Sequence, residues 1–238
     1  MDTHFIFIHG GPGLDCSYWF PLTSLLEKRN KNFSYTAYTQ GSVKDIKQFA
    51  DFKDELQLII DKNSGKKIYI IAHSFGALIA LSWLKKIRPQ RGVHLVLTNW
   101  VYNFEWLEKS YAKNQETFDN EPVDMKLAEK YLYYLPLYFE NLEQGSIILK
   151  NIQYSDRLSN IYSETKTLNF ERVLELNSSM ITSVSSTAEK LIDPDYISEI
   201  CKKLNIKNYL INSSSHFPFS EDPNTFIKLL SKITGEKL

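Results

Sequence analysis

The stretch Lys-Ile-Tyr-Ile-Ile-Ala-His-Ser-Phe-Gly-Ala-Leu-Ile-Ala-Leu, residues 67–81, decides the fold of this chain. Its first part is a short isoleucine-rich run, which predicts a strand over 67–72 that is buried on both faces. Its second part is apolar nearly all round, which predicts a helix over 75–87 that packs on several sides. Ser74 therefore falls at a tight junction between a buried strand and a buried helix.

Strands and helices alternate on both sides of this stretch. Short apolar runs predict further strands over 5–8, 33–39, 93–97, 180–185 and 209–212. Apolar residues at helical spacing predict helices over 17–28, 49–60, 195–204 and 224–233. Because strands that alternate with helices form βαβ units, we expect an α/β fold with a mostly parallel sheet of about six strands.

One long segment breaks this alternation. Residues 102–178 contain no recognisable strand pattern, a single glycine and many aromatic residues, with prolines at 122 and 136. This composition predicts a helical insertion, which we expect to form a cap over a core made of residues 1–101 and 179–238.

The composition limits the classes of function. The chain has 238 residues, 43% of them apolar, and 28 basic residues balance 28 acidic ones. A nucleic-acid surface needs concentrated positive charge, so we expect no nucleic-acid partner. Two cysteines do not make a disulfide scaffold in a chain of this size. The start shows no signal-peptide pattern and no apolar run approaches a membrane span, so we expect a cytoplasmic protein without a membrane partner.

The junction at Ser74 has the residues that an exposed nucleophile needs. The residues two before and two after such a serine must be small, and Ala72 and Gly76 meet this demand. The turn would present the Ser74 hydroxyl at the carboxyl edge of the sheet, where open α/β folds bind ligands. The helix that begins at Phe75 would offer a free N–H to a developing oxyanion. The alternative is an N-cap serine before an ordinary helix.

A glycine-rich loop, His-Gly-Gly-Pro-Gly over 9–13, follows the first strand and faces the same edge. Such a loop exposes backbone N–H groups, so we expect Gly11 and Phe75 to form an oxyanion hole and Gly10 to contact substrate. The alternatives are a tight turn without a role or a phosphate-binding loop, although no Gly-Lys-Ser/Thr follows. His9 is expected to organise the loop rather than to carry protons.

The candidate base is His216, in the sequence Ser-His-Phe-Pro-Phe that follows the last strand. Its position after a strand places it at the same sheet edge as Ser74, and we expect Phe217 beside it to contact substrate. A solvent-facing loop histidine is the alternative. His4 and His94 lie at strand starts, on the opposite rim, and His73 should point away from the serine hydroxyl.

The order of these motifs resembles the α/β-hydrolase superfamily: His-Gly-Gly-Pro-Gly, then small-x-Ser-x-Gly-small, then an acid, then His-Phe-Pro-Phe-x-Glu-Asp-Pro. Within it the chain is similar to the capped branch of prolyl aminopeptidases, small esterases and C–C bond hydrolases. The resemblance implies a Ser74–His216–acid triad. The chain departs from the family by starting at the strand of the glycine loop, which implies a sheet that lacks the first two strands. Ala72 and Phe75 also differ from the prolyl aminopeptidase pattern.

The resemblance places the acid after the strand that follows the cap. Glu189 precedes His216 by 27 residues and Asp193 precedes it by 23. Asp193 stands before Pro194 at the start of a predicted helix, as a helix N-cap would. We therefore expect Glu189 to hold the imidazole in its useful tautomer, with Asp193 as the alternative.

The resemblance and the motifs together imply a serine hydrolase that cleaves a small-molecule carboxylic ester through an acyl-enzyme. We expect no cofactor and no metal, while the oligomeric state is open. Alternatives within the fold are a prolyl-type aminopeptidase, a thioesterase and a C–C bond hydrolase. A non-hydrolytic acyltransferase and a catalytically dead ligand-binding protein are alternatives from other classes. The aromatic residues of the insertion would either line an apolar pocket or form the core of the insertion itself.

Overall fold

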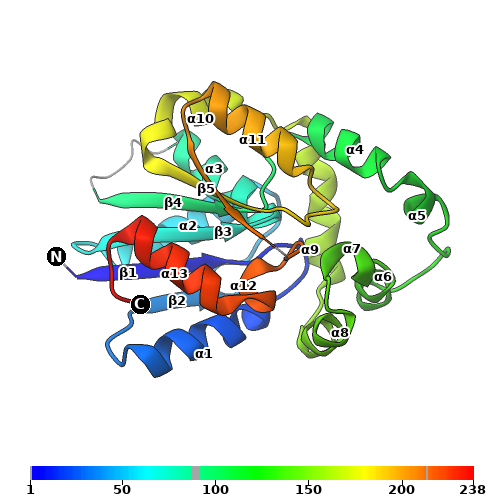
Figure 1. Ribbon diagram of the computed structural model, residues 1–238. Coiled ribbons are helices and arrows are strands. Elements are labelled where there is room, and N and C mark those ends of the chain that lie inside the picture. Colours follow the sequence, from blue (N-terminus) through cyan, green and yellow to red (C-terminus); the bar gives the residue numbers. More distant parts are fainter. Residues whose placement is uncertain (1, 87–91, 213) are drawn as a thin grey trace.

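The computed structural model of the chain describes residues 2–86, 92–212 and 214–238 (Figure 1). Within these residues six strands form one sheet in the order β2-β1-β3-β4-β5-β6, and every neighbouring pair is parallel. The strands are β1 (Thr3–Ile8), β2 (Tyr35–Tyr38), β3 (Lys67–His73), β4 (Val93–Thr98), β5 (Ile181–Ser186) and β6 (Lys207–Ile211). The predicted fold class, an α/β fold with a parallel sheet of about six strands, is confirmed.

The register of the central strands brings their carboxyl ends to one edge. Ile8 of β1 pairs with Ala72 of β3, and Ala72 pairs with Leu97 of β4. The segments that follow these three strands therefore start side by side, although they are far apart along the chain. This edge is where open α/β sheets bind ligands.

Two apolar clusters cover the two faces of the sheet. On one face pack α2 (Asp51–Asp61), α3 (Phe75–Lys86) and α11 (Pro194–Lys203). On the other face pack η1 (Cys16–Trp19), α1 (Phe20–Arg29) and α13 (Pro223–Thr234). Helices on both faces explain why β3 reads as an unbroken apolar run, because its residues after Lys67 are all buried.

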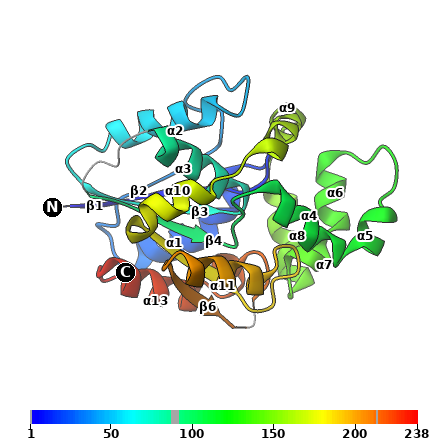
Figure 2. The ribbon, with the colours of Figure 1, turned by 90° about the horizontal axis from the view of Figure 1, so that it is seen from above.

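The chain between β4 and β5 is helical in the described structure. Its elements are α4 (Phe104–Ala112), α5 (Gln115–Asp119), α6 (Leu127–Tyr133), α7 (Leu135–Tyr138), α8 (Leu142–Asn151), α9 (Asp156–Asn160), η2 (Ile161–Thr167), α10 (Glu171–Asn177) and η3 (Ser178–Met180). Figures 1 and 2 show α5 to α8 gathered beyond the carboxyl edge of the sheet, away from both termini. In contrast, α10 returns to the core and packs near α3.

Element boundaries mostly agree with the sequence prediction to within two residues. The helix predicted over 17–28 is instead a 3₁₀ turn followed by α1, because Asp15 caps the turn and Pro21 stands in the first turn of α1. The predicted end of α3 at residue 87 lies outside the described residues. The four-residue helix α12 (Pro218–Glu221) was not predicted. Among the residues described, every helix is too short or too polar to span a bilayer.

Candidate active site

Ser74 lies in the turn between β3 and α3 with a φ angle of +52°. Residues other than glycine rarely adopt this left-handed conformation, which is typical of strained functional positions. The turn is fixed on both sides: Ser74 N–H donates to Thr98 O (3.1 Å), and Ser74 O accepts from Ala77 N–H (3.0 Å). His73 and Phe75 are buried, whereas Ser74 is only half-buried and lines a cavity. The turn therefore presents the serine at the cavity wall.

The glycine at position 76 is required by a close approach of two elements. A Cβ atom built there would lie 2.7 Å from His9 O and 2.9 Å from Ile8 O. The start of α3 thus crosses directly over the end of β1. This contact brings the glycine loop and the serine turn together at one edge of the sheet.

Two backbone N–H groups next to Ser74 have no partner among the described residues, those of Gly11 and Phe75. Both residues line the cavity space beside Ser74. Phe75 is the first residue of α3, so its N–H also lies at the positive end of the helix dipole. The two groups are therefore available as hydrogen-bond donors, and their role as an oxyanion hole stays a prediction.

His216 and Glu189 form a buried pair. His216 Nδ1 lies 2.8 Å from Glu189 Oε2, and the two side chains are 3% and 1% exposed. The other carboxylate oxygen, Glu189 Oε1, accepts from the N–H groups of Leu191 (2.7 Å) and Ile192 (3.2 Å). The carboxylate is therefore held in place and can keep the proton on His216 Nδ1, which leaves Nε2 free to accept one.

The alternative acid lies elsewhere in the structure. Asp193 is the N-cap of α11, where its carboxylate accepts from Asp195 N–H (3.1 Å) and pairs with Lys113 (2.5 Å). That pairing holds the pKa of Asp193 below its ordinary value. The structure thus brings Glu189, and not Asp193, into contact with His216.

Ser74 and His216 line the same cavity. Within the described chain no hydrogen bond joins the serine hydroxyl to the imidazole. Such bonds are often long in unliganded sites and tighten when substrate binds. The two side chains therefore line a shared space. Proton transfer between them would require the serine hydroxyl and the imidazole to come within hydrogen-bond distance.

A chain of hydrogen bonds connects the three loops of the site behind this cavity. Gly10 N–H donates to the hydroxyl of Tyr18, which lies 3.1 Å from His73 Nδ1, and His73 Nε2 lies 2.8 Å from His216 O. A carbonyl only accepts, so Nε2 carries the proton and Nδ1 accepts from Tyr18. Burial and the nearby His216 hold the pKa of His73 well below its ordinary value, so this ring is neutral. It positions the loops and has no nitrogen left for substrate.

Sequence reasoning missed further residues that hold the His216 loop. Asn99 Nδ2 donates to Ser215 O (2.9 Å) and His216 O (3.0 Å), and Tyr138 O accepts from His216 N–H (3.0 Å). Asn99 directly follows a predicted strand, so its place at the sheet edge was a usable signal. Nothing in the sequence points to Tyr138, because its contact depends on how the insertion folds back.

The remaining predicted residues have different surroundings. His9 organises its loop: Nδ1 donates to Gly10 O (2.7 Å) and Nε2 accepts from Gln40 N–H (3.0 Å), and burial lowers its pKa to about 4.

Phe217 lines the cavity and stacks on Phe139 at 4.6 Å. Gly10 does not line the cavity, because it packs behind the wall, where a Cβ atom would lie 3.1 Å from that of Ser74. Its predicted contact with substrate stays a prediction.

The cavity at the sheet edge has a volume of about 200 Å³. One wall comes from the core, with Ser74, His216 and the glycine loop, and the other comes from α4, α6, α7, α9 and η2 of the insertion. The described residues contain no cluster of three metal-ligating side chains. The groups that converge on this cavity are a hydroxyl, an imidazole–carboxylate pair and free backbone N–H groups.

The comparisons with known proteins concern the fold of the chain. The family model described as the alpha/beta hydrolase fold matches residues 3–223. Among curated proteins, no sequence matches this chain. An esterase from Thermogutta terrifontis is similar in structure at 15% identity, with a TM-score of 0.72 over 98% of this chain and 90% of the esterase.

Two further solved structures show the same fold. A bromoperoxidase from Bacillus anthracis has 11% identity and a TM-score of 0.74 over 99% of this chain and 93% of its own. A meta-cleavage product hydrolase from Pseudomonas fluorescens has 14% identity and a TM-score of 0.72 over 99% and 91%. Identities this low show a common fold only. Since the family model spans nearly the whole chain, the protein belongs to the α/β-hydrolase fold family.

Proposed function

We propose that this protein is a serine hydrolase that cleaves a small-molecule ester, with Ser74 as nucleophile, His216 as general base and Glu189 as the acid that orients His216. One observation carries the proposal. The fully buried Glu189–His216 pair, at 2.8 Å, opens onto the same cavity as a serine held at a strained φ angle. A merely structural serine would need neither the strained turn nor a histidine–carboxylate pair beside its cavity.

The proposed reaction has two halves. His216 Nε2 takes the proton of Ser74 Oγ, which bonds to the ester carbonyl carbon. The bond between that carbon and the alcohol oxygen then breaks, and His216 returns the proton to the leaving alcohol. In the second half, water deprotonated by His216 attacks the acyl-enzyme, the acid leaves, and Ser74 regains its proton.

The oxyanion of each tetrahedral intermediate would bind to the N–H groups of Gly11 and Phe75. Their lack of other partners in the described chain supports this role, because a preorganised donor need not break a bond to act. Loss of one such donor typically costs about 10²–10³ in kcat.

The charges around the cavity favour an ester over a peptide with a free amino terminus. Among the described residues, no carboxylate lines the cavity. Lys130 lines it, but its ammonium group is already paired with Glu121 at 2.5 Å. The substrate of an aminopeptidase has an ammonium group at its amino terminus. When buried, this group needs an opposite charge, which an aminopeptidase would have to supply here. A neutral carboxylic ester carries no such demand.

The test uses a fluorophosphonate probe and a chromogenic short-chain ester. We expect the probe to label the wild-type chain on Ser74, and Ser74→Ala to lose both labelling and ester turnover. Ser185→Ala is a matched control, since Ser185 is buried in β5 away from the cavity. Turnover that survives in Ser74→Ala would refute the proposal, and a wild-type chain that neither labels nor turns over would favour a ligand-binding protein.

A further inference from the structure

Two unlike spaces meet at Ser74. The larger, which we call the chamber, is the cavity of about 200 Å³ that His216 also lines. The smaller, which we call the recess, measures about 30 Å³ and is lined by Gly11, Ser74 and Phe75. Because the recess includes both oxyanion donors, a carbonyl group bound there would have one substituent in the recess and the other in the chamber.

The recess is small and mostly apolar. Beyond the residues already named, its wall comes from five aliphatic side chains and from Tyr111 and Tyr162, which also line the chamber. The aliphatic residues are Leu78, Val101, Leu107, Leu191 and Ile192. About 10–15 Å³ is needed to hold one water-sized atom, so the recess has room for about two carbon atoms. Away from the oxyanion donors its wall is mainly aliphatic, which favours an apolar chain over a polar one. The recess therefore fits a short acyl chain.

The chamber has a wall of phenols supplied by the insertion: Tyr111, Tyr131, Tyr134, Tyr138 and Tyr162. The hydroxyl of Tyr134 donates to Glu121. The hydroxyls of Tyr131 and Tyr138 make no hydrogen bond to any described residue, whereas that of Tyr162 is shielded from solvent beside Tyr111. Hydroxyl groups left unpaired beside a cavity are costly unless a ligand or water completes them.

These phenols are neutral and close together. Burial, and then the proximity of Tyr131 and Tyr111, hold the pKa of Tyr138 well above its ordinary value. Burial raises the pKa of Tyr111 to about 12. Each hydroxyl therefore keeps its proton and can both donate and accept, which is also the capacity of an alcohol group on a ligand.

The chamber offers no unpaired charge for an anion or a cation. Lys130 is the one charged side chain among its described lining residues, and Glu121 neutralises it. Its volume of about 200 Å³ exceeds that of a cavity of about 150 Å³ known to hold benzene. A neutral group the size of one ring, rich in hydroxyls, matches the chamber in charge, size and hydrogen bonding.

We propose that the substrate is an acetyl or propionyl ester of a neutral polyol about the size of one sugar ring, with the acyl chain in the recess and the polyol in the chamber. This inference rests on the proposed function. Ser74 Oγ first adds to the acyl carbon. The bond from that carbon to the polyol oxygen then breaks, and the polyol leaves with the proton held by His216. Water then releases acetate or propionate.

A matched pair of esters tests the chamber. Mono-O-acetyl-myo-inositol and cyclohexyl acetate share a six-membered carbon ring and differ in its hydroxyl groups. We expect kcat/KM to be at least about 10-fold higher for the inositol ester, and this ratio to fall about 3- to 10-fold in Tyr138→Phe and in Tyr131→Phe. Tyr133→Phe is the control, because the Tyr133 hydroxyl donates to Thr117 O and does not line the chamber.

A second pair tests the recess. We expect kcat/KM for 4-nitrophenyl acetate to exceed that for the hexanoate by about 10-fold or more, and Leu107→Ala to narrow this gap by enlarging the recess. Faster hydrolysis of the hexanoate by the wild type would overturn the placement of the acyl chain.

Fluorophosphonate labelling distinguishes failure of the polyol assignment from failure of the serine hydrolase proposal. If Ser74 is labelled but the wild type prefers cyclohexyl acetate, turns over neither ester, or keeps its ratio in both tyrosine variants, the polyol assignment is wrong and the serine hydrolase stands. If Ser74 is not labelled and no ester is cleaved, both proposals fail together.

Discussion

The two walls of the cavity are built in different ways. The core wall consists of loops that leave parallel strands at a common edge, and hydrogen bonds to the sheet and to each other hold Ser74 and His216 there. The insertion wall consists of short helices that present phenol rings, several of whose hydroxyls have no partner in the described chain. In the proposed function, the core wall carries the chemistry and the insertion wall selects the substrate.

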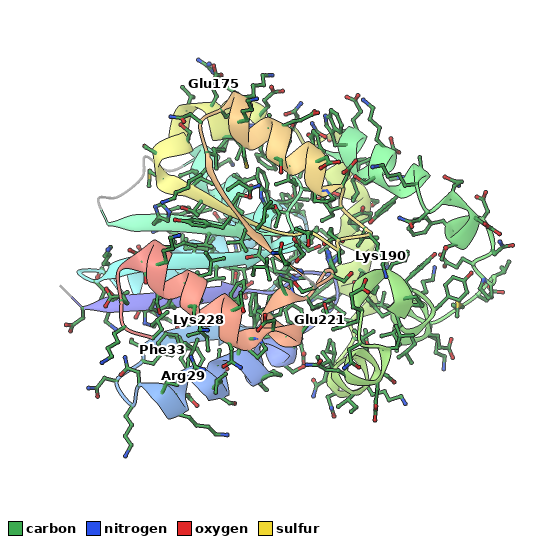
Figure 3. The ribbon with its side chains drawn as sticks, viewed as in Figure 1. Arg29, Phe33, Glu175, Lys190, Glu221 and Lys228 are labelled. Atoms are coloured by element: carbon green, nitrogen blue, oxygen red, sulfur yellow. The ribbon has the colours of Figure 1, made fainter. Side chains whose placement is uncertain are left out.

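One carboxylate joins the two walls. Glu221 of α12 accepts from Ser215 N–H (2.7 Å) in the His216 loop, and from Glu140 N–H (2.7 Å) and Asn141 N–H (3.2 Å) in the insertion. Figure 3 shows Glu221 where α12 meets the helices of the insertion. The position of the insertion is thereby tied to the residue that we propose as the base.

The largest expected effect comes from substituting Glu189, the proposed acid of the core wall. Glu189→Gln should lower kcat by about 10⁴, because the amide can no longer hold the proton on His216 Nδ1 and the wrong tautomer faces Ser74. Steady-state kinetics on a chromogenic acetate ester measure the loss. Asp193→Asn is the matched control, and a loss in Asp193→Asn as large as that in Glu189→Gln would contradict the assignment of the acid.

A second prediction concerns the stability of the core wall towards acid. Burial holds the pKa of His9 at about 4, against 6.5 when unfolded. Below pH 6.5 the unfolded chain takes up a proton that the folded chain refuses, so the free energy of unfolding should fall by about 3 kcal/mol as the pH drops from 7 to 4.

Urea unfolding at several pH values, compared between the wild type and His9→Gln, measures this term. The slope between pH 6.5 and 4 should be smaller in the variant. An identical slope in the two proteins would show that His9 is not the neutral, buried group that its surroundings indicate.

Weakening the Glu221 hydrogen bonds that join the two walls should have a smaller effect on activity. Glu221→Gln leaves one acceptor oxygen for three N–H groups, so the insertion should loosen against the His216 loop and kcat/KM should fall by about 10-fold. Kinetics on the acetate ester, with thermal unfolding of the same variant, separate a local change from a global one. Glu140→Gln changes an exposed carboxylate nearby and should stay within about twofold; equal losses in both variants would argue against the bridge.

The core wall was also the part that the sequence could predict. Its strands are continuous apolar runs, and each motif directly follows a strand, so parallel pairing alone placed residues 9–13, 74 and 216 at one edge. The resemblance placed the acid after the strand that follows the insertion. Glu189 was preferred there because Asp193, before a proline, matches a helix N-cap, and Asp193 stayed the alternative.

The rest depends on contacts between segments distant in sequence. The helix α12 spans only four residues, too few for any periodic pattern. Tyr18 contacts His73, 55 residues away, and Asn99 contacts Ser215, 116 residues away, and only the packed fold brings these partners near. In the insertion, aromatic residues that line the chamber and those that form its own core have the same composition, so the sequence left both roles open and the structure shows residues in each.

The most direct test of the account asks where the acyl group goes. Rapid mixing with 4-nitrophenyl acetate should give a burst of one nitrophenol per chain in the wild type and none in Ser74→Ala. Acid quenching and peptide mass spectrometry should then find the acetyl group on Ser74. A burst that persists in Ser74→Ala, or an acetyl group on another residue, would contradict the account.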